Sequence, residues 1–372
     1  MTHPNITPIV MPKWGLSMKE GTLAAWHVEE GQTIVPGQEI MDVETDKIAN
    51  AVEAPDGGLL RRRIGEVGLV YPVKALLGVM APAETSDAEI DAFVSDFAVP
   101  TAGGGDEDDG PVHHFVHTPS GRLRYAMRPG EGTPTVFVHG FGGDLDNWLF
   151  NIDAAAAAGP AYALDLPGHG GSDKAIARPG LAALAEAVAA FMQATGLSDA
   201  HLVGHSMGGA VASLVALRGD GLVRALTLIS PAGLGAEINA GYIDGFVAAE
   251  SRRELKPVLK DLFADENLVS RQMIDDLLKY KRLDGVPAAL RGLASAMFAG
   301  GRQTTVLTDR LAALSIPIQV IWGARDAVIP ATHAKALPHA KVEIVETAGH
   351  MAMMEAAGRV NDLIRMQTQG AA

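Results

Sequence analysis

The segment of this chain that most constrains its fold is residues 204–208, which read Gly-His-Ser-Met-Gly. An apolar run at residues 200–203 precedes this segment, and a run compatible with a helix follows at residues 209–217. The order of strand, serine and helix predicts a sharp turn that holds Ser206 out from the end of a buried strand. The flanking glycines let the backbones approach closely. Ser206 is therefore a candidate nucleophile for acyl chemistry, although this five-residue pattern alone is common.

From about residue 111 onward, apolar strands alternate with helical patterns such as residues 181–195. This alternation predicts a mainly parallel sheet covered by helices on both faces. Residues 236 to about 305 interrupt it with mostly helical sequence, which we interpret as a cap inserted over the carboxyl edge of the sheet. The strands that we expect are residues 135–139, 161–165, 201–204, 225–230, 318–322 and 341–345.

A serine hydroxyl needs a base, a group that orients the base, and donors for the oxyanion. Asp326 and His350 each follow an expected strand, so both should emerge at the carboxyl edge of the sheet beside Ser206. They come in the order serine, acid, histidine, which suits this kind of turn. The expected oxyanion donors are the backbone N–H groups of Met207 and Phe141. No His or acidic residues have the spacing of a metal site.

These motifs together resemble the α/β-hydrolase superfamily. The resemblance covers about residues 111–368, and it is carried by residues 139–142, residues 165–172 and the three candidate triad residues. It implies a C-terminal α/β-hydrolase fold with a helical cap, over residues 111–372. Asp165 is a rival for the acid, but it precedes the serine, and its Asp-Leu-Pro-Gly-His-Gly context indicates a structural turn.

Residues 1–83 read differently, as short strands separated by glycine and proline. Gly31 and Gly68 are 37 residues apart, as are Ile40 and Leu77. We therefore expect two similar β-halves that form one small all-β sandwich.

Residues 43–52 predict a strand, a tight turn and a second strand, with Lys47 at the exposed tip. Most lysines in such turns are only solvated. However, residues 5–83 resemble a lipoyl domain through Met-Pro-Lys-Trp-Gly at 11–15, Glu-Thr-Asp-Lys at 44–47 and Ala-Pro at 54–55. The resemblance implies lipoate attached covalently to Lys47. Biotin carriers instead place methionine on both sides of the lysine.

Residues 84–110 are expected to form a linker. A capping-box pattern begins at Ser86, and apolar residues at 90, 93, 94 and 97 predict a short helix with one apolar face. This face could bind a partner enzyme or pack on the second domain of the same chain, and the sequence leaves both alternatives open. Residues 101–110 are rich in glycine and acid, which predicts a mobile stretch.

Composition narrows the class of protein. The chain has 372 residues, no cysteine and a formal net charge of −14. The acidic charge argues against a nucleic-acid partner. Residues 1–5 lack the basic start of a signal peptide, and no apolar run has the roughly 20 residues that a membrane span needs. We therefore expect a cytoplasmic protein without a membrane partner.

A lipoyl carrier joined to a serine acyl-transfer domain resembles the family of transacylase subunits from bacterial acetoin dehydrogenase-type complexes. The resemblance implies transfer of acetyl from the lipoyl group on Lys47 to coenzyme A. It also implies two partners, a thiamine-dependent acetoin-cleaving enzyme and dihydrolipoamide dehydrogenase. Two alternatives stay open: a serine hydrolase or thioesterase that uses water, and a non-catalytic lipoyl scaffold.

Overall fold

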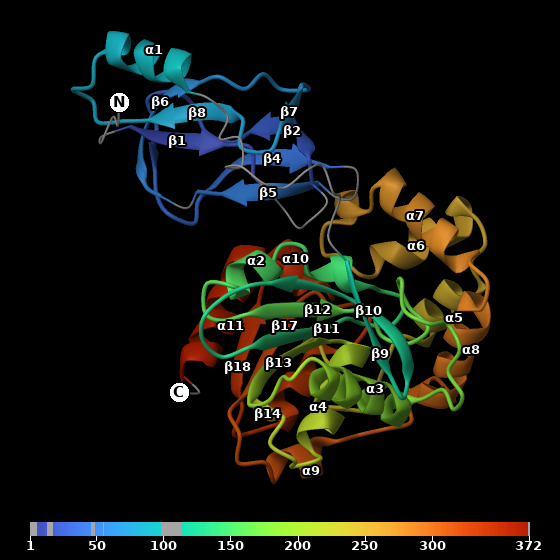
Figure 1. The fold of residues 1–372 in the computed structure, drawn as a ribbon. Helices are drawn as coiled ribbons and strands as arrows, with labels where there is room; N and C mark the ends of the chain where they lie inside the picture. Colours follow the sequence, from blue (N-terminus) through green and yellow to red (C-terminus); the bar gives the residue numbers. More distant parts are fainter. Residues whose placement is uncertain (1–5, 13–17, 46–48, 55, 98–112, 371–372) are drawn as a thin grey trace. The chain divides into compact units, whose positions relative to one another are not determined.

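The computed structural model describes residues 6–12, 18–45, 49–54, 56–97 and 113–370. They belong to two compact units, Met1–Pro111 and Val112–Ala372, which are described separately below (Figure 1). Lys47 and residues 98–112 lie outside the described residues, so the predictions of a tip lysine and of a mobile stretch at 101–110 remain predictions.

The first unit is a β-sandwich of two four-stranded sheets, as the sequence predicts (Figure 1). One sheet has the order β1 (Thr7–Val10), β8 (Leu76–Met80), β6 (Gly58–Arg63), β3 (Thr33–Ile34). The other has the order β5 (Ala49–Glu53), β4 (Glu39–Glu44), β2 (Glu20–Trp26), β7 (Val70–Pro72). The core between them consists of buried aliphatic and methionine side chains such as Met11, Leu23 and Leu60.

The predicted 37-residue repeat is confirmed by matching hydrogen bonds in the two halves. The N–H of Gly31 donates to the carbonyl of Leu60 at 2.7 Å, and the N–H of Gly68 donates to the carbonyl of Leu23 at 2.7 Å. Both glycines have positive φ, 86° and 88°, which explains why glycine recurs there. In each half, a leucine carbonyl therefore accepts a hydrogen bond from the turn glycine of the other half.

The predicted helix after the sandwich is α1 (Asp87–Asp96), and it begins with the expected capping box of Ser86 and Glu89. Its apolar face packs on the first unit itself, where Ile90 is fully buried against Leu76 and Val79. This differs from both alternatives that the sequence left open, because the sheet of β1, β8 and β6 already covers this face.

Arginines on β6 strengthen the same contact. Arg61 donates to the carbonyls of Pro82 and Thr85, both at 2.8 Å, and pairs with Asp87. Arg62 pairs with Asp91. The helix is therefore part of the first unit and not of a free linker.

The second unit contains one eight-stranded sheet that is parallel at its centre. Its strands are, in spatial order, β18 (Lys341–Val345), β17 (Ile318–Gly323), β14 (Val223–Ile229), β13 (Ala200–His205), β11 (Thr135–Val138), β12 (Ala161–Leu164), β10 (Gly121–Arg128) and β9 (His114–Thr118). The six expected strands are all present. The sequence analysis missed β9 and β10, which add an antiparallel hairpin at one edge.

Helices cover both faces of this sheet (Figure 1). On one face α3 (Leu181–Ala194) packs beside α4 (Met207–Ala216), and on the other α2 (Ile152–Ala155) packs beside α11 (Ala357–Gly370). The shorter helical elements are η1 (Leu145–Trp148), α9 (Thr308–Ala312), η3 (Ala331–Ala336) and α10 (Ala352–Glu355).

Residues 236–305 form the helical insertion that the sequence predicts. It contains α5 (Ala240–Ala248), α6 (Arg252–Lys260), η2 (Glu266–Leu268), α7 (Arg271–Lys281), α8 (Val286–Met297) and a small hairpin of β15 (Phe298–Ala299) and β16 (Arg302–Gln303). We call this insertion the cap. Among the described residues, no helix has both the length and the apolar character that crossing a membrane requires.

Candidate active site

Ser206 occupies a strained turn between β13 and α4. Its backbone has φ 52° and ψ −120°, a region that a side-chain-bearing residue rarely adopts. A Cβ at Gly204 would collide with the backbone of Gly208, and a Cβ at Gly208 would collide with the carbonyl of Val138. The glycines are therefore required by close backbone packing, and they hold the serine at the carboxyl end of β13.

Asp326 follows β17, and the hydrogen bonds that its carboxylate accepts hold it in one orientation. One oxygen accepts the N–H groups of Val328 at 2.8 Å and Ile329 at 2.9 Å. The other accepts the Nε1–H of Trp322 at 2.9 Å and faces Nδ1 of His350 at 2.8 Å. The side chain of Asp326 is completely buried.

Burial alone would raise the pKa of Asp326. The nearby imidazole of His350 and the N–H groups of Val328 and Ile329 outweigh it and lower this pKa below its ordinary value. An ionised Asp326 requires a proton on Nδ1 of His350 and leaves Nε2 free to accept one. This is the tautomer that a general base for a serine hydroxyl needs.

His350 also lies against the serine turn. Its ring centroid is 4.7 Å from that of His205, the residue directly before Ser206. In addition, Nε2 of His205 donates to the carbonyl of His350 at 3.0 Å. The sequence analysis did not name His205 as a site residue. Its position inside the Gly-His-Ser-Met-Gly segment was the available signal that it contacts the base.

The two expected oxyanion donors share one property. The backbone N–H groups of Phe141 and Met207 donate no hydrogen bond to any described residue. Met207 is the first residue of α4, so its N–H also benefits from the positive end of the helix dipole. Two free donors beside a strained serine are the arrangement that stabilises a developing oxyanion.

Two neutral histidines hold the loop that carries Phe141. Nε2 of His169 accepts the N–H of Gly142 at 3.1 Å, and Nε2 of His139 accepts the N–H of Leu166 at 3.0 Å. Burial lowers the pKa of both side chains, that of His169 to about 3, so both remain uncharged at neutral pH. Both side chains therefore have a structural role.

The cap lies directly over this loop. Phe141 contacts Phe246 of α5 and Phe298 of β15, with ring centroids 5.8 Å and 6.4 Å away. Gly142 has φ 73°, and a Cβ there would collide with the ring of Phe246. The cap therefore places two phenylalanines, Phe246 and Phe298, against the loop of Phe141, and the sequence analysis did not identify either of them.

Asp165, the rival acid, has a structural role. Its buried carboxylate accepts the N–H of Leu145 at 2.8 Å and of Gly171 at 2.6 Å, and it pairs with Arg124 at 2.5 Å. These bonds occupy the carboxylate and secure its loop, as expected from the sequence context.

Two other predictions concern ligands. Lys47 lies outside the described residues, but the strands that flank it, β4 and β5, pair in antiparallel register as far as Glu44 and Ala49. The described strands on either side of Lys47 are therefore the two that the sequence predicts. Among the described residues, no group of three His, Asp or Glu side chains is placed to hold a metal ion.

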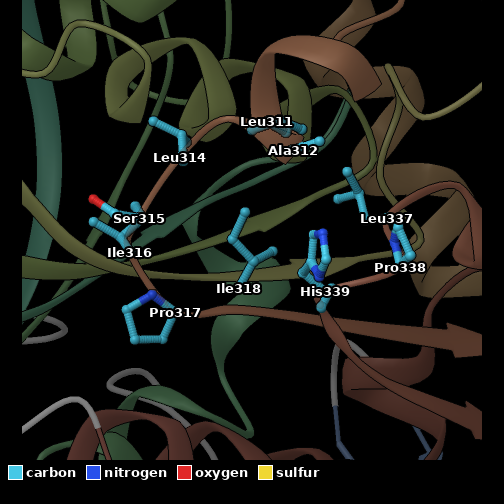
Figure 2. Close-up of a pocket in the computed structure, with 11 residues that line it drawn as sticks. Leu311, Ala312, Leu314, Ser315, Ile316, Pro317, Ile318, Leu337, Pro338 and His339 are labelled. Carbon is cyan, nitrogen blue, oxygen red and sulfur yellow. The ribbon is translucent and has the colours of Figure 1, made fainter.

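A separate cavity of about 300 Å³ lies near the start of β17 (Figure 2). Leu311, Leu314, Ile318 and Leu337 supply apolar walls, and His339 lies at its side. Because β13 and β17 run parallel, the start of β17 is at the opposite edge of the sheet from Ser206. This cavity is not part of the site around the serine.

Known proteins match both units. The model of the α/β hydrolase fold matches residues 133–357, and the model described as biotin-requiring enzyme matches residues 7–68, a range that includes Lys47. A protein from Cupriavidus necator is 54% identical over 368 residues, covering 99% of this chain and 98% of its own length. It is named the dihydrolipoyllysine-residue acetyltransferase component of an acetoin cleaving system. The chain belongs to this family.

A second member of the family, from Pseudomonas putida, carries the same name and is 49% identical, covering 96% of both chains. Among solved structures, a meta-cleavage product hydrolase from Pseudomonas fluorescens matches with a TM-score of 0.63 at 21% identity, covering 70% of this chain and 98% of its own. This last likeness supports the fold alone. Together these matches confirm the predicted combination of a lipoyl-type carrier and an α/β-hydrolase fold.

Proposed function

We propose that this protein transfers acetyl from the lipoyl group on Lys47 to coenzyme A through the triad of Ser206, His350 and Asp326. The observation that supports it most directly is the buried pair of His350 and Asp326, 2.8 Å apart, packed against the serine turn. The family to which the chain belongs is named for this class of reaction.

In the first half of the reaction, Nε2 of His350 takes the proton of Ser206 as the hydroxyl oxygen attacks the carbonyl of a bound acetyl thioester. The N–H groups of Met207 and Phe141 bind the oxyanion. When the carbon–sulfur bond breaks, His350 returns the proton to the departing thiolate, and the acetyl group remains on Ser206 as an ester. Asp326 keeps the proton on Nδ1 of His350 throughout.

In the second half, His350 takes the proton from the thiol of coenzyme A, whose sulfur attacks the acetyl ester. As the ester bond breaks, His350 gives this proton to the oxygen of Ser206. Water would give acetate instead, with the same triad. We propose that the cap limits water, because Phe246 and Phe298 cover the loop that contributes Phe141. The chemistry thus depends on the triad, and the choice of acceptor depends on the cap.

A lipoyl group on Lys47 would supply the acetyl group as a thioester on a long side chain. We place this function in a cytoplasmic multienzyme complex. The proposed partners are a thiamine-dependent acetoin-cleaving enzyme, which would load the carrier, and dihydrolipoamide dehydrogenase, which would reoxidise it. Because α1 is packed on the carrier unit, the connection to the second unit would begin after Asp96 and be shorter than the sequence predicts.

The test uses the full chain, lipoylated at Lys47 and loaded with acetyl, and measures acetyl-coenzyme A and acetate together. Ser206→Ala should lower the rate of acetyl transfer about 10⁴-fold or more. Ser213→Ala is the matched control, because this buried hydroxyl only bonds the carbonyl of Gly209 within α4. Acetate as the main product would favour the hydrolase, and full transfer by Ser206→Ala would favour the scaffold.

A further inference from the structure

Glu355, the last residue of α10, connects the loop of the general base to the cap. Its carboxylate accepts the N–H of Gly349, the residue before His350, at 2.7 Å. Its other oxygen accepts the N–H of Ala264 at 2.6 Å, in the cap between α6 and η2. One side chain thus bonds two segments that are 85 residues apart in the sequence.

The two segments also contact each other directly. The N–H of Met351, the residue after His350, donates to the carbonyl of Leu262 at 3.1 Å. A Cβ at Gly349 would lie 2.7 Å from the nitrogen of Ala264, so this glycine allows the cap to approach. His350 is therefore flanked by Gly349, which packs against the cap, and by Met351, which donates a hydrogen bond to it.

The acid loop has a similar connection on its own side. Asn239, which caps α5, donates through its side chain to the carbonyl of Ala327 at 3.1 Å and through its backbone to the carbonyl of Val328 at 2.8 Å. Val328 in turn donates to Asp326. The cap therefore bonds both loops that present the proposed base and acid.

Glu355 occupies an unfavourable place for a carboxylate. It is half-buried, and no ion pair with a cation is found for it among the described residues. Burial raises its pKa, although the N–H groups of Gly349, Ala264 and Asp265 oppose that effect. A half-buried carboxylate with these two bonds is better explained by what it connects than by the stability of α10.

We infer that Glu355 is a positioning residue that sets His350 in register with the cap. This inference rests on the proposed function of His350 as the base. When the cap is seated, the two bonds of Glu355 fix the backbone of Gly349 and with it the direction of the imidazole. Loss of either bond should impair proton transfer at Ser206 without altering the residues that bind the acyl group.

The main variant is Glu355→Gln, which has the same shape but one acceptor oxygen. Its amide nitrogen must face the N–H of either Gly349 or Ala264, so one bond is lost. With a chromogenic acetyl ester, we expect kcat to fall about 10- to 100-fold, the effect of losing one hydrogen bond to a charged group, with little change in KM. Glu346→Gln, at an exposed residue three positions before Gly349, is the control and should leave kcat unchanged.

Two readouts need no substrate. The downfield proton NMR signal of Nδ1–H in His350 should shift or broaden in Glu355→Gln, and hydrogen exchange at Gly349 and Ala264 should accelerate. Glu355→Asp, whose shorter side chain reaches only one of the two N–H groups, provides a milder variant if the first folds poorly. An unchanged His350 signal with kcat near that of the intact protein would overturn the inference.

The same readouts separate this inference from the proposed function. If Ser206→Ala transfers acetyl at the full rate, the proposed function fails. The NMR signal and the exchange rates would still report whether Glu355 positions His350. If both change as expected, Glu355 connects the cap to the histidine whatever reaction the site performs.

Discussion

The change Asp326→Asn tests the triad most sharply, because the structure fixes what an amide would do there. An asparagine oxygen could still accept the N–H groups of Val328 and Ile329, as Oδ1 of Asp326 does. The amide nitrogen would then face His350 and the indole of Trp322, where Oδ2 now accepts. An amide NH₂ group donates hydrogen bonds and cannot accept one, so His350 would have to present an unprotonated Nδ1 to it.

The consequence is a change of tautomer. With Nδ1 unprotonated, the proton of a neutral imidazole is on Nε2, and His350 cannot take the proton of Ser206. The expected loss in kcat is about 10⁴-fold, or about 5 kcal/mol of transition-state stabilisation. The structural cost should be small by comparison, since Trp322 keeps its second acceptor, the carbonyl of Ile329 at 3.2 Å.

The assay is a pre-steady-state measurement of Ser206 acetylation with a chromogenic ester, alongside urea unfolding of the same sample. Asp165→Asn is the matched control: its amide nitrogen would replace the acceptor of either Leu145 or of Arg124 and Gly171, which should destabilise the fold without changing the tautomer of His350. If Asp326→Asn acetylates within tenfold of the intact protein, or if Asp165→Asn loses more, then the assignment of the acid is refuted.

Three further predictions concern stability. Ser206→Gly should remove acyl transfer but raise the unfolding free energy by about 1 kcal/mol, because glycine adopts a φ of 52° without strain. An unfolding free energy below that of the intact protein in urea would contradict this. Burial lowers the pKa of His201 to about 3, so its contribution to stability is present above pH 6.5 and is lost as the pH falls toward 3, by up to about 1.4 kcal/mol per pH unit. His201→Leu should reduce that slope between pH 7 and 5 in urea unfolding, and an unchanged slope would count against it. Ile90→Ala should destabilise the carrier unit by about 2–4 kcal/mol in thermal unfolding, and no shift would mean that α1 is not held there.

The sequence best predicted those features that depend on both the type and the position of a residue. The six parallel strands are short apolar runs, and the glycines around Ser206 mark a turn that other residues cannot form. The edge hairpin of β9 and β10 was missed because its side chains are mixed and only partly buried. Edge strands bury one face at most, so their hydrophobic signal is weak.

The helix α1 shows a different limit. Its capping box and apolar face could be predicted, because both depend on residues close together in sequence. The surface that this face covers could not, since an apolar stripe does not specify its partner. Arg61 and Arg62 were the available signal: three consecutive arginines on a strand of an acidic chain indicate nearby carboxylates, here Asp87 and Asp91.

The choice between hydrolysis and transfer depends on residues that no motif identifies. The triad treats water and a thiol alike, so the acceptor must be selected by what surrounds the acetyl ester on Ser206. In this protein the cap places Phe246 against Gly142 and Phe141, and Glu355 and Asn239 attach the same cap to the loops of the base and the acid. In the proposed mechanism, the exclusion of water and the alignment of the base therefore depend on the same seated cap. A cap that opened to admit water would also release His350 from the register in which water could be activated.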